Sequence, residues 1–176
     1  MFENLKLKLA HYTTRKKYLK KNLEPIVFNK IISNALEFLI LMPEDDKEFY
    51  HSVELLQYLN IHRKNVTIFA AEHKFNLIPE KEKYKFISYT QTQKNKFNLP
   101  DPILVNKLKD KSFDVVIDLN RNENIFFSAV TNIVNSNLRM SYIKERSEGY
   151  YNFQFAETGN DPEVSLRNLI NFLQMF

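Results

Sequence analysis

The chain has 176 residues, 44% of them hydrophobic, so its length and composition fit one domain with a substantial core and exclude a disordered protein. It has no cysteine, which excludes disulfides and thiolate zinc sites, and its two glycines, Gly149 and Gly159, are too few for a dinucleotide fingerprint or a P-loop. The net charge of +4 is uneven: residues 1–30 carry eight Lys and Arg and two Glu, so binding to nucleic acid or a membrane would depend on that segment.

Residues 1–36 predict a basic helical extension ahead of the main domain. Residues 3–22 fit a helix with a weak apolar side, although the early alternation of Leu and Lys also fits a short strand. Pro25 suits the first turn of a second helix, in which apolar residues recur at helical spacing from Phe28 to Ala35. The pattern leaves open whether this extension packs on the domain or extends away from it.

The rest of the chain, residues 37–176, alternates short apolar runs with amphipathic segments. Runs with the length of strands lie at 38–42, 65–70, 85–89, 113–119, 138–143 and 151–155. Apolar residues recur at helical spacing over 49–59, 101–108, 126–134 and 161–173. Such alternation favours a parallel sheet with helices on both faces. We therefore expect an α/β fold: a three-layer, Rossmann-like domain with a mainly parallel sheet of five or six strands.

In such a sheet, ligands bind beyond the carboxyl ends of the strands, near the point where the strand order reverses. Two acidic groups are expected at that edge: Glu44, Asp45 and Asp46 after the first strand, and Asp118 at the end of the fourth, with Asn120 and Arg121 behind it. A carboxylate there can act as a general base or bind a ligand. Asp45 and Asp46 are therefore the candidate catalytic residues, and Asp118, Asn120 and Arg121 the candidate ligand-binding residues.

Structural roles also explain these residues. Asp45 or Asp46 can cap the helix that follows, because an anion is stabilised at the positive end of a helix, and we favour this role. Asp118 can accept hydrogen bonds from loop amides, or pair with Arg121 or Arg139.

No pattern in the sequence indicates a metal site or a nucleophile. The four histidines, His11, His51, His62 and His73, lack the spacing of a zinc-binding helix. No GxSxG motif is present, and there is no cysteine to act as a nucleophile. We expect neither a metal nor a cofactor.

A basic run lies in the extension, made of Arg15, Lys16, Lys17, Lys20 and Lys21. Basic side chains at this density can attach a protein to anionic lipid or to nucleic-acid phosphates. The alternative, which we favour, is a solvated helix face that aids solubility. Together with Tyr12, Tyr18 and Leu19, the run could also dock a partner protein.

Residues 113–142, FDVVIDLNRNENIFFSAVTNIVNSNLRMSY, resemble the middle of the N-terminal domain of family 9 glycosyltransferases, the lipopolysaccharide heptosyltransferases. The matching residues are Asp114, Ile117, Asp118, Leu119 and Arg139. The earlier stretch 39–72 also follows that family's order of strand, acidic turn, helix and strand. The resemblance covers roughly 37–145 and implies the acceptor-side, Rossmann-like half of such an enzyme. The chain is also similar to a group of short bacterial proteins that keep this half-fold alone.

The chain departs from that family at functional positions. The family's proposed catalytic base follows a glycine, whereas no glycine precedes Asp45, the nearest equivalent, or Asp46, which fits with a shift of one residue. Met140 or Ser141 stands where the family has glycine after the arginine. The family's second domain binds the nucleotide-sugar donor, and we expect no such domain within this chain.

Three functions follow as hypotheses. We favour a non-catalytic, glycosyltransferase-like half-fold that binds a protein partner, or a sugar or nucleotide-sugar ligand. The second is an enzyme with Asp45 as base, either a glycosyltransferase that needs a partner's donor domain or a small hydrolase that uses the acidic edge. The third is attachment to a membrane or nucleic acid through the basic run. The sequence shows no secretory signal and no apolar stretch of ~20 residues, so we expect a cytoplasmic protein.

Overall fold

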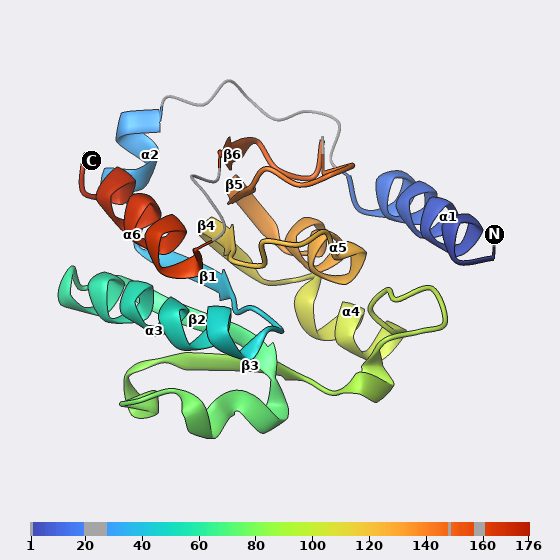
Figure 1. Cartoon of the computed structure of the whole chain (residues 1–176), viewed down its shortest axis with the longest axis horizontal. Helices are drawn as coiled ribbons and strands as arrows, with labels where there is room; N and C mark the ends of the chain where they lie inside the picture. Colours follow the sequence, from blue (N-terminus) through green and yellow to red (C-terminus); the bar gives the residue numbers. More distant parts are fainter. Residues whose placement is uncertain (1, 20–27, 148, 157–160) are drawn as a thin grey trace.

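The computed structural model describes residues 2–19, 28–147, 149–156 and 161–176, which form an α/β architecture (Figure 1). The strands are β1 (Glu37–Leu41), β2 (Asn65–Ala71), β3 (Lys85–Tyr89), β4 (Ser112–Asp118), β5 (Asn135–Tyr142) and β6 (Phe153–Phe155). The α-helices are α1 (Phe2–Lys17), α2 (Phe28–Asn34), α3 (Asp46–Ile61), α4 (Pro102–Leu108), α5 (Ile125–Ile133) and α6 (Pro162–Leu173). Short 3-10 helices flank β3: η1 (Glu72–Leu77), η2 (Lys81–Lys83) and η3 (Gln91–Gln93).

The strands form one sheet in the order β3-β2-β1-β4-β5-β6, and each neighbouring pair is parallel. The prediction of a Rossmann-like domain with a parallel sheet is confirmed. The strand order reverses between β1 and β4, where Leu41 stands opposite Asp118. The segments that follow these two strands therefore lie side by side at the carboxyl edge of the sheet, where open α/β sheets bind their ligands.

β1 is apolar on both faces because it is a central strand. Phe38 and Ile40 belong to a core cluster that the sheet shares with α3 and α6, whereas Leu39 and Leu41 belong to a second cluster with α4 and α5. All four side chains are almost fully buried. An uninterrupted apolar run of this kind is typical of a parallel strand covered on both sides.

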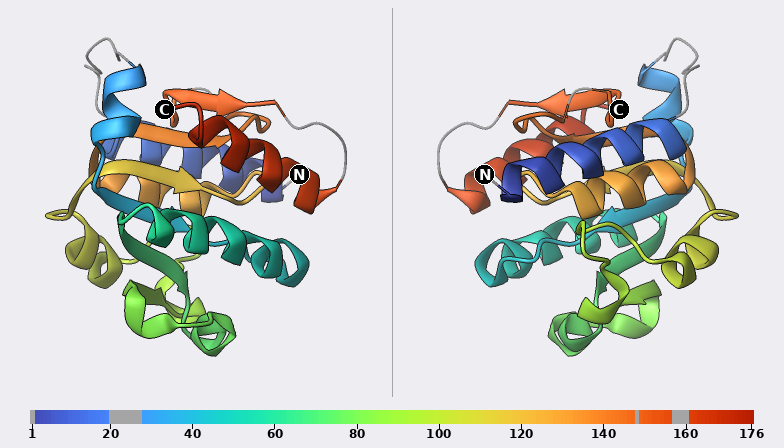
Figure 2. Two further views of the ribbon diagram at one scale, coloured as in Figure 1. Left: turned by 90° about the vertical axis from the view of Figure 1, so that its left-hand side faces the viewer. Right: turned by 90° about the vertical axis from the view of Figure 1, so that its right-hand side faces the viewer.

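The helices form layers on the two faces of the sheet. Figure 2 shows α3 and α6 on one face, α5 on the other, and α1 lying outside α5. All nine residues of α5 are buried, because α5 lies between the sheet and α1. Ala10 of α1 packs against Ile125 and Ala129 of α5 in a third apolar cluster. The helix at the start of the chain thus packs on the domain, while a domain boundary near residue 36 stays a prediction.

Side-chain caps fix the starts of the helices that follow the strands. Asp45, Asp101, Asn124 and Asp161 accept hydrogen bonds from backbone N–H groups in the first turns of α3, α4, α5 and α6. The caps of α3 and α5 place their residues at the carboxyl edge, next to the reversal of strand order. Within the described residues, no helix has both the length and the apolar character needed to cross a bilayer.

Candidate functional site

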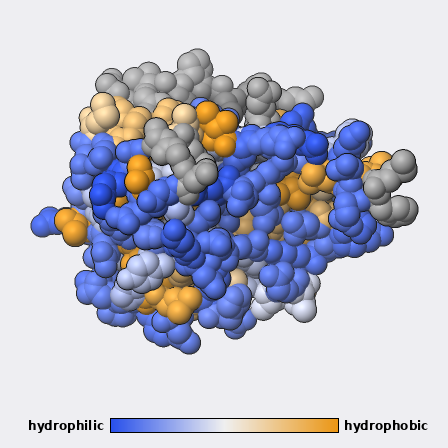
Figure 3. All heavy atoms as spheres, in the orientation of Figure 1, coloured by the Kyte–Doolittle hydropathy of each residue, from blue (hydrophilic) through white to orange (hydrophobic). Residues whose placement is uncertain are grey.

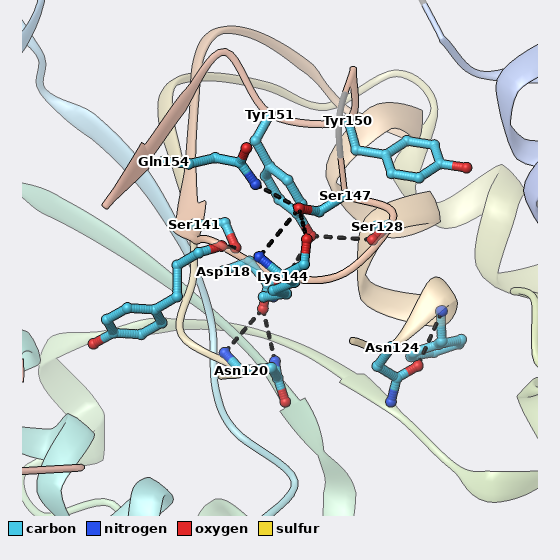
Figure 4. Close-up of polar contacts among 12 residues, drawn as sticks. Asp118, Asn120, Asn124, Ser128, Ser141, Lys144, Ser147, Tyr150, Tyr151 and Gln154 are labelled. Atoms are coloured by element: carbon cyan, nitrogen blue, oxygen red, sulfur yellow. Dashed lines mark hydrogen bonds and ion pairs between the residues drawn. The ribbon is translucent and has the colours of Figure 1, made fainter. Parts of the chain in front are cut away.

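Asp118, the last residue of β4, is completely buried and accepts hydrogen bonds from four donors (Figure 4). Its Oδ1 atom accepts from the backbone N–H of Asn120 at 3.0 Å and from the side-chain amide of the same residue at 2.8 Å. Its Oδ2 atom accepts from Nζ of Lys144 at 2.6 Å and from the hydroxyl of Tyr151 at 2.5 Å. A carboxylate offers about four acceptor positions, so the hydrogen-bonding capacity of Asp118 is satisfied inside the protein.

Lys144 reaches Asp118 from the segment that follows β5. Its side chain is only 2% exposed, and its ammonium group lies 5.3 Å from the centre of the Tyr151 ring. The hydroxyl of Ser147 donates to the carbonyl of Lys144 at 2.7 Å and accepts from the side-chain amide of Gln154 at 2.6 Å. These hydrogen bonds fix the backbone that carries Lys144. The ammonium group is therefore held in place beside Asp118, as a buried ion pair requires if it is to offset the loss of hydration.

Tyr151 completes this group as a neutral donor. Burial raises the pKa of Tyr151 well above its ordinary value, and the negative charge of Asp118 raises it further. Its hydroxyl also lies 3.2 Å from the hydroxyl of Ser128 on α5. A tyrosine held in this way stays protonated at neutral pH and donates to Asp118 rather than acting as a base.

Glu44 makes a second group of contacts at the reversal of strand order. One carboxylate oxygen accepts from the hydroxyl of Tyr89 at 3.0 Å and pairs with Lys94, and the other accepts from the side-chain amide of Asn124 at 2.9 Å. The backbone N–H of Glu44 donates to Asn120 at 3.1 Å. Glu44 therefore joins the segments that follow β1, β3 and β4 across the place where a ligand would enter.

Aromatic rings stabilise the ammonium group of Lys94, the cation that pairs with Glu44. The ammonium group of Lys94 lies 5.2 Å from the centre of the Tyr89 ring and 4.7 Å from that of Phe126, a distance at which rings attract cations. Phe126 is completely buried on α5. Burial and the charge of Glu44 raise the pKa of Tyr89, which therefore remains a hydrogen-bond donor.

Asp45 and Asp46, the candidate catalytic residues, have structural contacts at the start of α3. The carboxylate of Asp45 accepts from the backbone N–H of Glu48 at 2.9 Å, so the capping role is observed. Asp46 pairs with the buried Lys74 at 2.8 Å. The hydrogen bond from Lys74, followed by its positive charge, lowers the pKa of Asp46. Lys74 also donates to the backbone carbonyl of Glu44.

A cluster around His11 holds α1 beside this edge. The Nδ1 atom of His11 lies 2.9 Å from the hydroxyl of Tyr150, and its Nε2 atom lies 2.8 Å from the carboxylate of Glu123. Burial lowers the pKa of His11, while the nearby Glu123 acts in the opposite direction. The guanidinium group of Arg15 lies 5.6 Å from the centre of the Tyr150 ring. Polar contacts as well as apolar packing thus attach α1 to the domain.

Described residues near the edge line two hollows in the surface. The larger, of about 350 Å³, lies between α1 and the segments after β3 and β4, and its lining includes Lys6, Lys96 and Asn124. The other, of about 280 Å³, lies at the ends of β2 and β3, and its lining includes His73 and Tyr89. Neither is lined by any of the acidic residues predicted to form the site, which are Asp45, Asp46 and Asp118.

The structure thus unites only part of the predicted site. Asp118 and Asn120 are joined by a side-chain hydrogen bond. Asp45 lies in the segment between β1 and α3, and Arg121 is half buried after β4. The basic residues Arg15, Lys16 and Lys17 lie on α1, while positions 20 and 21 fall outside the described residues. In the part of the chain that the structure describes, no three His, Asp or Glu side chains gather as a metal site requires.

Lys144 and Tyr151 are absent from the site that the sequence predicts. A signal for Lys144 exists, because it follows β5, which pairs in parallel with β4, so that both strands end at the same edge. Nothing in the sequence marks Tyr151, since its position depends on its packing against α5.

Comparisons with known proteins identify the fold. The model of a family of unknown function (DUF6913) matches residues 12–176. No curated protein matches the sequence. The structure of Escherichia coli heptosyltransferase WaaC with ADP-2-deoxy-2-fluoro heptose is similar with a TM-score of 0.60 and 15% identity, covering 79% of this chain and 48% of that one. A mutant enoyl thioester reductase from Candida tropicalis gives a TM-score of 0.42 and 13% identity, covering 96% and 45%.

The similarity to the heptosyltransferase extends to the fold alone, because the sequences share so few residues. The chain spans about half the length of that enzyme. The described residues therefore have a glycosyltransferase-like fold, and any activity has to be argued from the side chains at the carboxyl edge.

Proposed function

The chain belongs to DUF6913, a family of unknown function, and from this premise we propose that it is a non-catalytic, glycosyltransferase-like half-fold that acts as a binding or interaction module. We infer that its relation to family 9 glycosyltransferases lies in their acceptor-side domain, and that it works in the cytoplasm with a protein partner. The similarity of fold to a heptosyltransferase supports the relation.

The four hydrogen bonds to Asp118 are the observation that carries this proposal. A general base needs a free lone pair that substrate can reach, whereas both oxygens of Asp118 already accept two bonds each, and the residue is completely buried. Freeing Asp118 would leave Lys144 as an unpaired buried cation, which costs several kcal/mol, on the order of 3–5. The charges at this edge thus contribute to structure.

The contacts of Glu44 support the same proposal. In Rossmann-like enzymes, the place where the strand order reverses is the entrance for the ligand. Here Glu44 meets Tyr89, Lys94 and Asn124 across that place. A ligand would have to replace several charge-assisted bonds with equivalent ones, and such bonds are stronger than neutral hydrogen bonds.

A turnover assay tests the proposal. The purified chain is incubated with ADP-linked and UDP-linked sugars, with and without acceptor sugars, and release of nucleotide is followed by chromatography. We expect no release above that in buffer. Nucleotide release that scales with the concentration of the chain would contradict the proposal.

The second candidate is a glycosyltransferase that obtains its donor domain from a partner, with Asp45 as base and Asp118 and Arg121 positioning substrate. One observation favours it: the carboxylate of Asp45 is exposed at the carboxyl edge, directly after β1. The bonds that satisfy Asp118 weigh against it.

Asp45→Asn separates this candidate from the first. Asparagine caps helices about as well as aspartate does, so the variant should keep its fold while losing the base. If turnover is found in the wild type, its loss in the variant would assign the base. Asp101→Asn, which alters the equivalent cap of α4, is the matched control and should leave turnover unchanged.

A further inference from the structure

The outward face of α1 carries three large apolar side chains in contact with solvent. Leu5, Leu9 and Tyr12 are 56%, 46% and 63% exposed. Their spacing of four and three residues places them on one side of a helix with about 3.6 residues per turn. The opposite side, with Ala10 and Thr14, is completely buried. We call the exposed set of Leu5, Leu9 and Tyr12 the outer stripe.

Basic residues lie on both sides of the outer stripe. Residues 4–17 contain five Lys and Arg and no Asp or Glu. The helical repeat places Lys8 and Arg15 along one side of the stripe and Lys6 and Lys17 along the other. Lys6 also pairs with Glu3, at the start of the helix, at 3.2 Å.

The neighbouring surface extends this positive charge. Lys96, from the segment after β3, lines the same hollow as Lys6. Two acidic residues, Glu3 and Glu123, also line it, and they pair with Lys6 and His11. Around the outer stripe, basic side chains therefore outnumber acidic ones.

We propose that the outer stripe docks this domain on an anionic membrane surface. Leu5, Leu9 and Tyr12 enter the region between headgroups and acyl chains, and the lysines on both sides contact anionic headgroups. A helix with apolar side chains and Lys or Arg beside them binds at such an interface. This inference does not rest on the proposed function, since it concerns α1 alone and would hold if the carboxyl edge proved catalytic.

The position of α1 suits this role. Figure 2 shows α1 on the outside of the molecule, along α5, with its length accessible from that side. In Figure 3, apolar atoms lie among hydrophilic ones on the right-hand side, where α1 is found. The helix can therefore lie flat on a membrane without any change in the sheet or in the buried contacts of Asp118.

A membrane fits the outer stripe better than nucleic acid does. Lysines alone would serve to contact phosphates, and exposed leucines between them would add nothing to binding along a phosphate backbone. The exposed Leu9 and Tyr12, with the ammonium group of Lys16 over the Tyr12 ring, instead point to a ligand with charge at its surface and hydrocarbon beneath. The source we commit to is a bilayer that contains anionic lipid.

Co-sedimentation of the full chain with vesicles tests this inference. Vesicles of phosphatidylcholine are compared with vesicles that also contain about 30% phosphatidylserine. We expect binding to the anionic vesicles, at least tenfold weaker binding to the neutral ones, and a steep loss at high salt because screening weakens the attraction of the lysines. Equal binding to both vesicles, or no binding to either, would overturn the inference.

Two pairs of variants identify the surface. Leu5→Gln with Leu9→Gln should weaken binding at least tenfold, and because Gln and Leu have similar helix propensities, α1 should persist. Its control is Ile61→Gln with Ile103→Gln, which removes apolar groups from α3 and α4 that are even more exposed.

Lys8→Gln with Lys17→Gln removes one lysine from each side of the outer stripe and should weaken binding by roughly fivefold for each charge removed. Its control, Lys109→Gln with Lys111→Gln, changes two exposed lysines elsewhere and should bind like the wild type. Unaltered binding of the leucine variant would overturn the inference. So would tighter binding to a DNA duplex than to anionic vesicles, or a dimer that the leucine variant converts to a monomer.

Discussion

Nζ of Lys144 lies 2.6 Å from Oδ2 of Asp118, and the two side chains are 2% and 0% exposed. The pair joins the segment after β5 to the end of β4 at the edge of the sheet where a Rossmann-like fold holds its ligands. The hydrogen bonds from Asn120 and Tyr151 occupy the remaining acceptor positions of the carboxylate. Asp118, which the sequence predicts to bind a ligand, thus makes structural contacts inside the domain.

Removing one partner of this pair should destabilise the protein strongly. Lys144→Met leaves a buried carboxylate without its cation, and we expect the free energy of unfolding to fall by about 3–5 kcal/mol. Urea unfolding followed by circular dichroism measures this change. Lys109→Met, at an exposed position, is the control and should change the stability by less than about 0.5 kcal/mol.

The double variant Lys144→Met with Asp118→Asn gives the coupling between the two residues. We expect it to be less destabilised than the sum of the two single variants, because no unpaired buried charge remains. Strict additivity would show that the two side chains do not interact in the folded protein.

The stability should depend on pH through His11. Burial lowers the pKa of His11 below its ordinary value of 6.5, so the unfolded chain takes up a proton more readily than the folded one. The stability that His11 contributes is therefore present above pH ~6.5 and is lost as the pH falls from there through the folded pKa.

Urea unfolding of the wild type and of His11→Gln, at about pH 7.5 and pH 5.5, measures this effect. The other titrating groups are common to both chains, so we expect a smaller loss of stability on acidification in the variant. An equal or larger loss in the variant would show that Glu123 outweighs burial.

The pKa of Asp46 should depend on Lys74. The hydrogen bond and charge of Lys74 lower this pKa, so Lys74→Met should return it toward its ordinary value of 3.8. Titration of the side-chain carboxyl of Asp46 by NMR measures the shift. Lys47→Met removes an exposed cation next to Asp46 in the sequence and should leave the pKa of Asp46 in place. The same pKa in the wild type and in Lys74→Met would contradict the ion pair.

The sequence predicts the sheet well where strands are apolar on both faces. Residues 38–42 and 113–119 correspond to β1 and β4 within one residue at each end. The apolar pattern predicts that β5 starts at residue 138, three residues after its observed start, because Asn135, Ser136 and Asn137 are polar. Asn135 and Ser136 join the sheet by pairing with the start of β4, and an apolar pattern cannot indicate such a contact.

The sequence predicts where the candidate site lies but not which contacts its side chains make. The end of β4 places Asp118 and Asn120 at the carboxyl edge, as the sequence indicates. Whether a carboxylate there faces solvent or an internal partner depends on Lys144 and Tyr151, which lie in a stretch of sequence without a periodic pattern. Lys144 and Tyr151 reach Asp118 because Tyr150 and Tyr151 pack against α5 and α1. Tertiary packing, which local sequence does not encode, thus decides between a ligand-binding and a structural aspartate.

The most direct test of the central claim is an NMR titration of the intact chain with an ADP-linked sugar. The backbone amides of Glu44, Asn120 and Asn124 report on the carboxyl edge, since these residues bond to one another there. We predict that their signals keep their positions up to millimolar ligand, because the protein's own side chains already make the hydrogen bonds that a ligand would need at this edge. Saturable shifts of these three amides would contradict this and would make the edge a ligand-binding site.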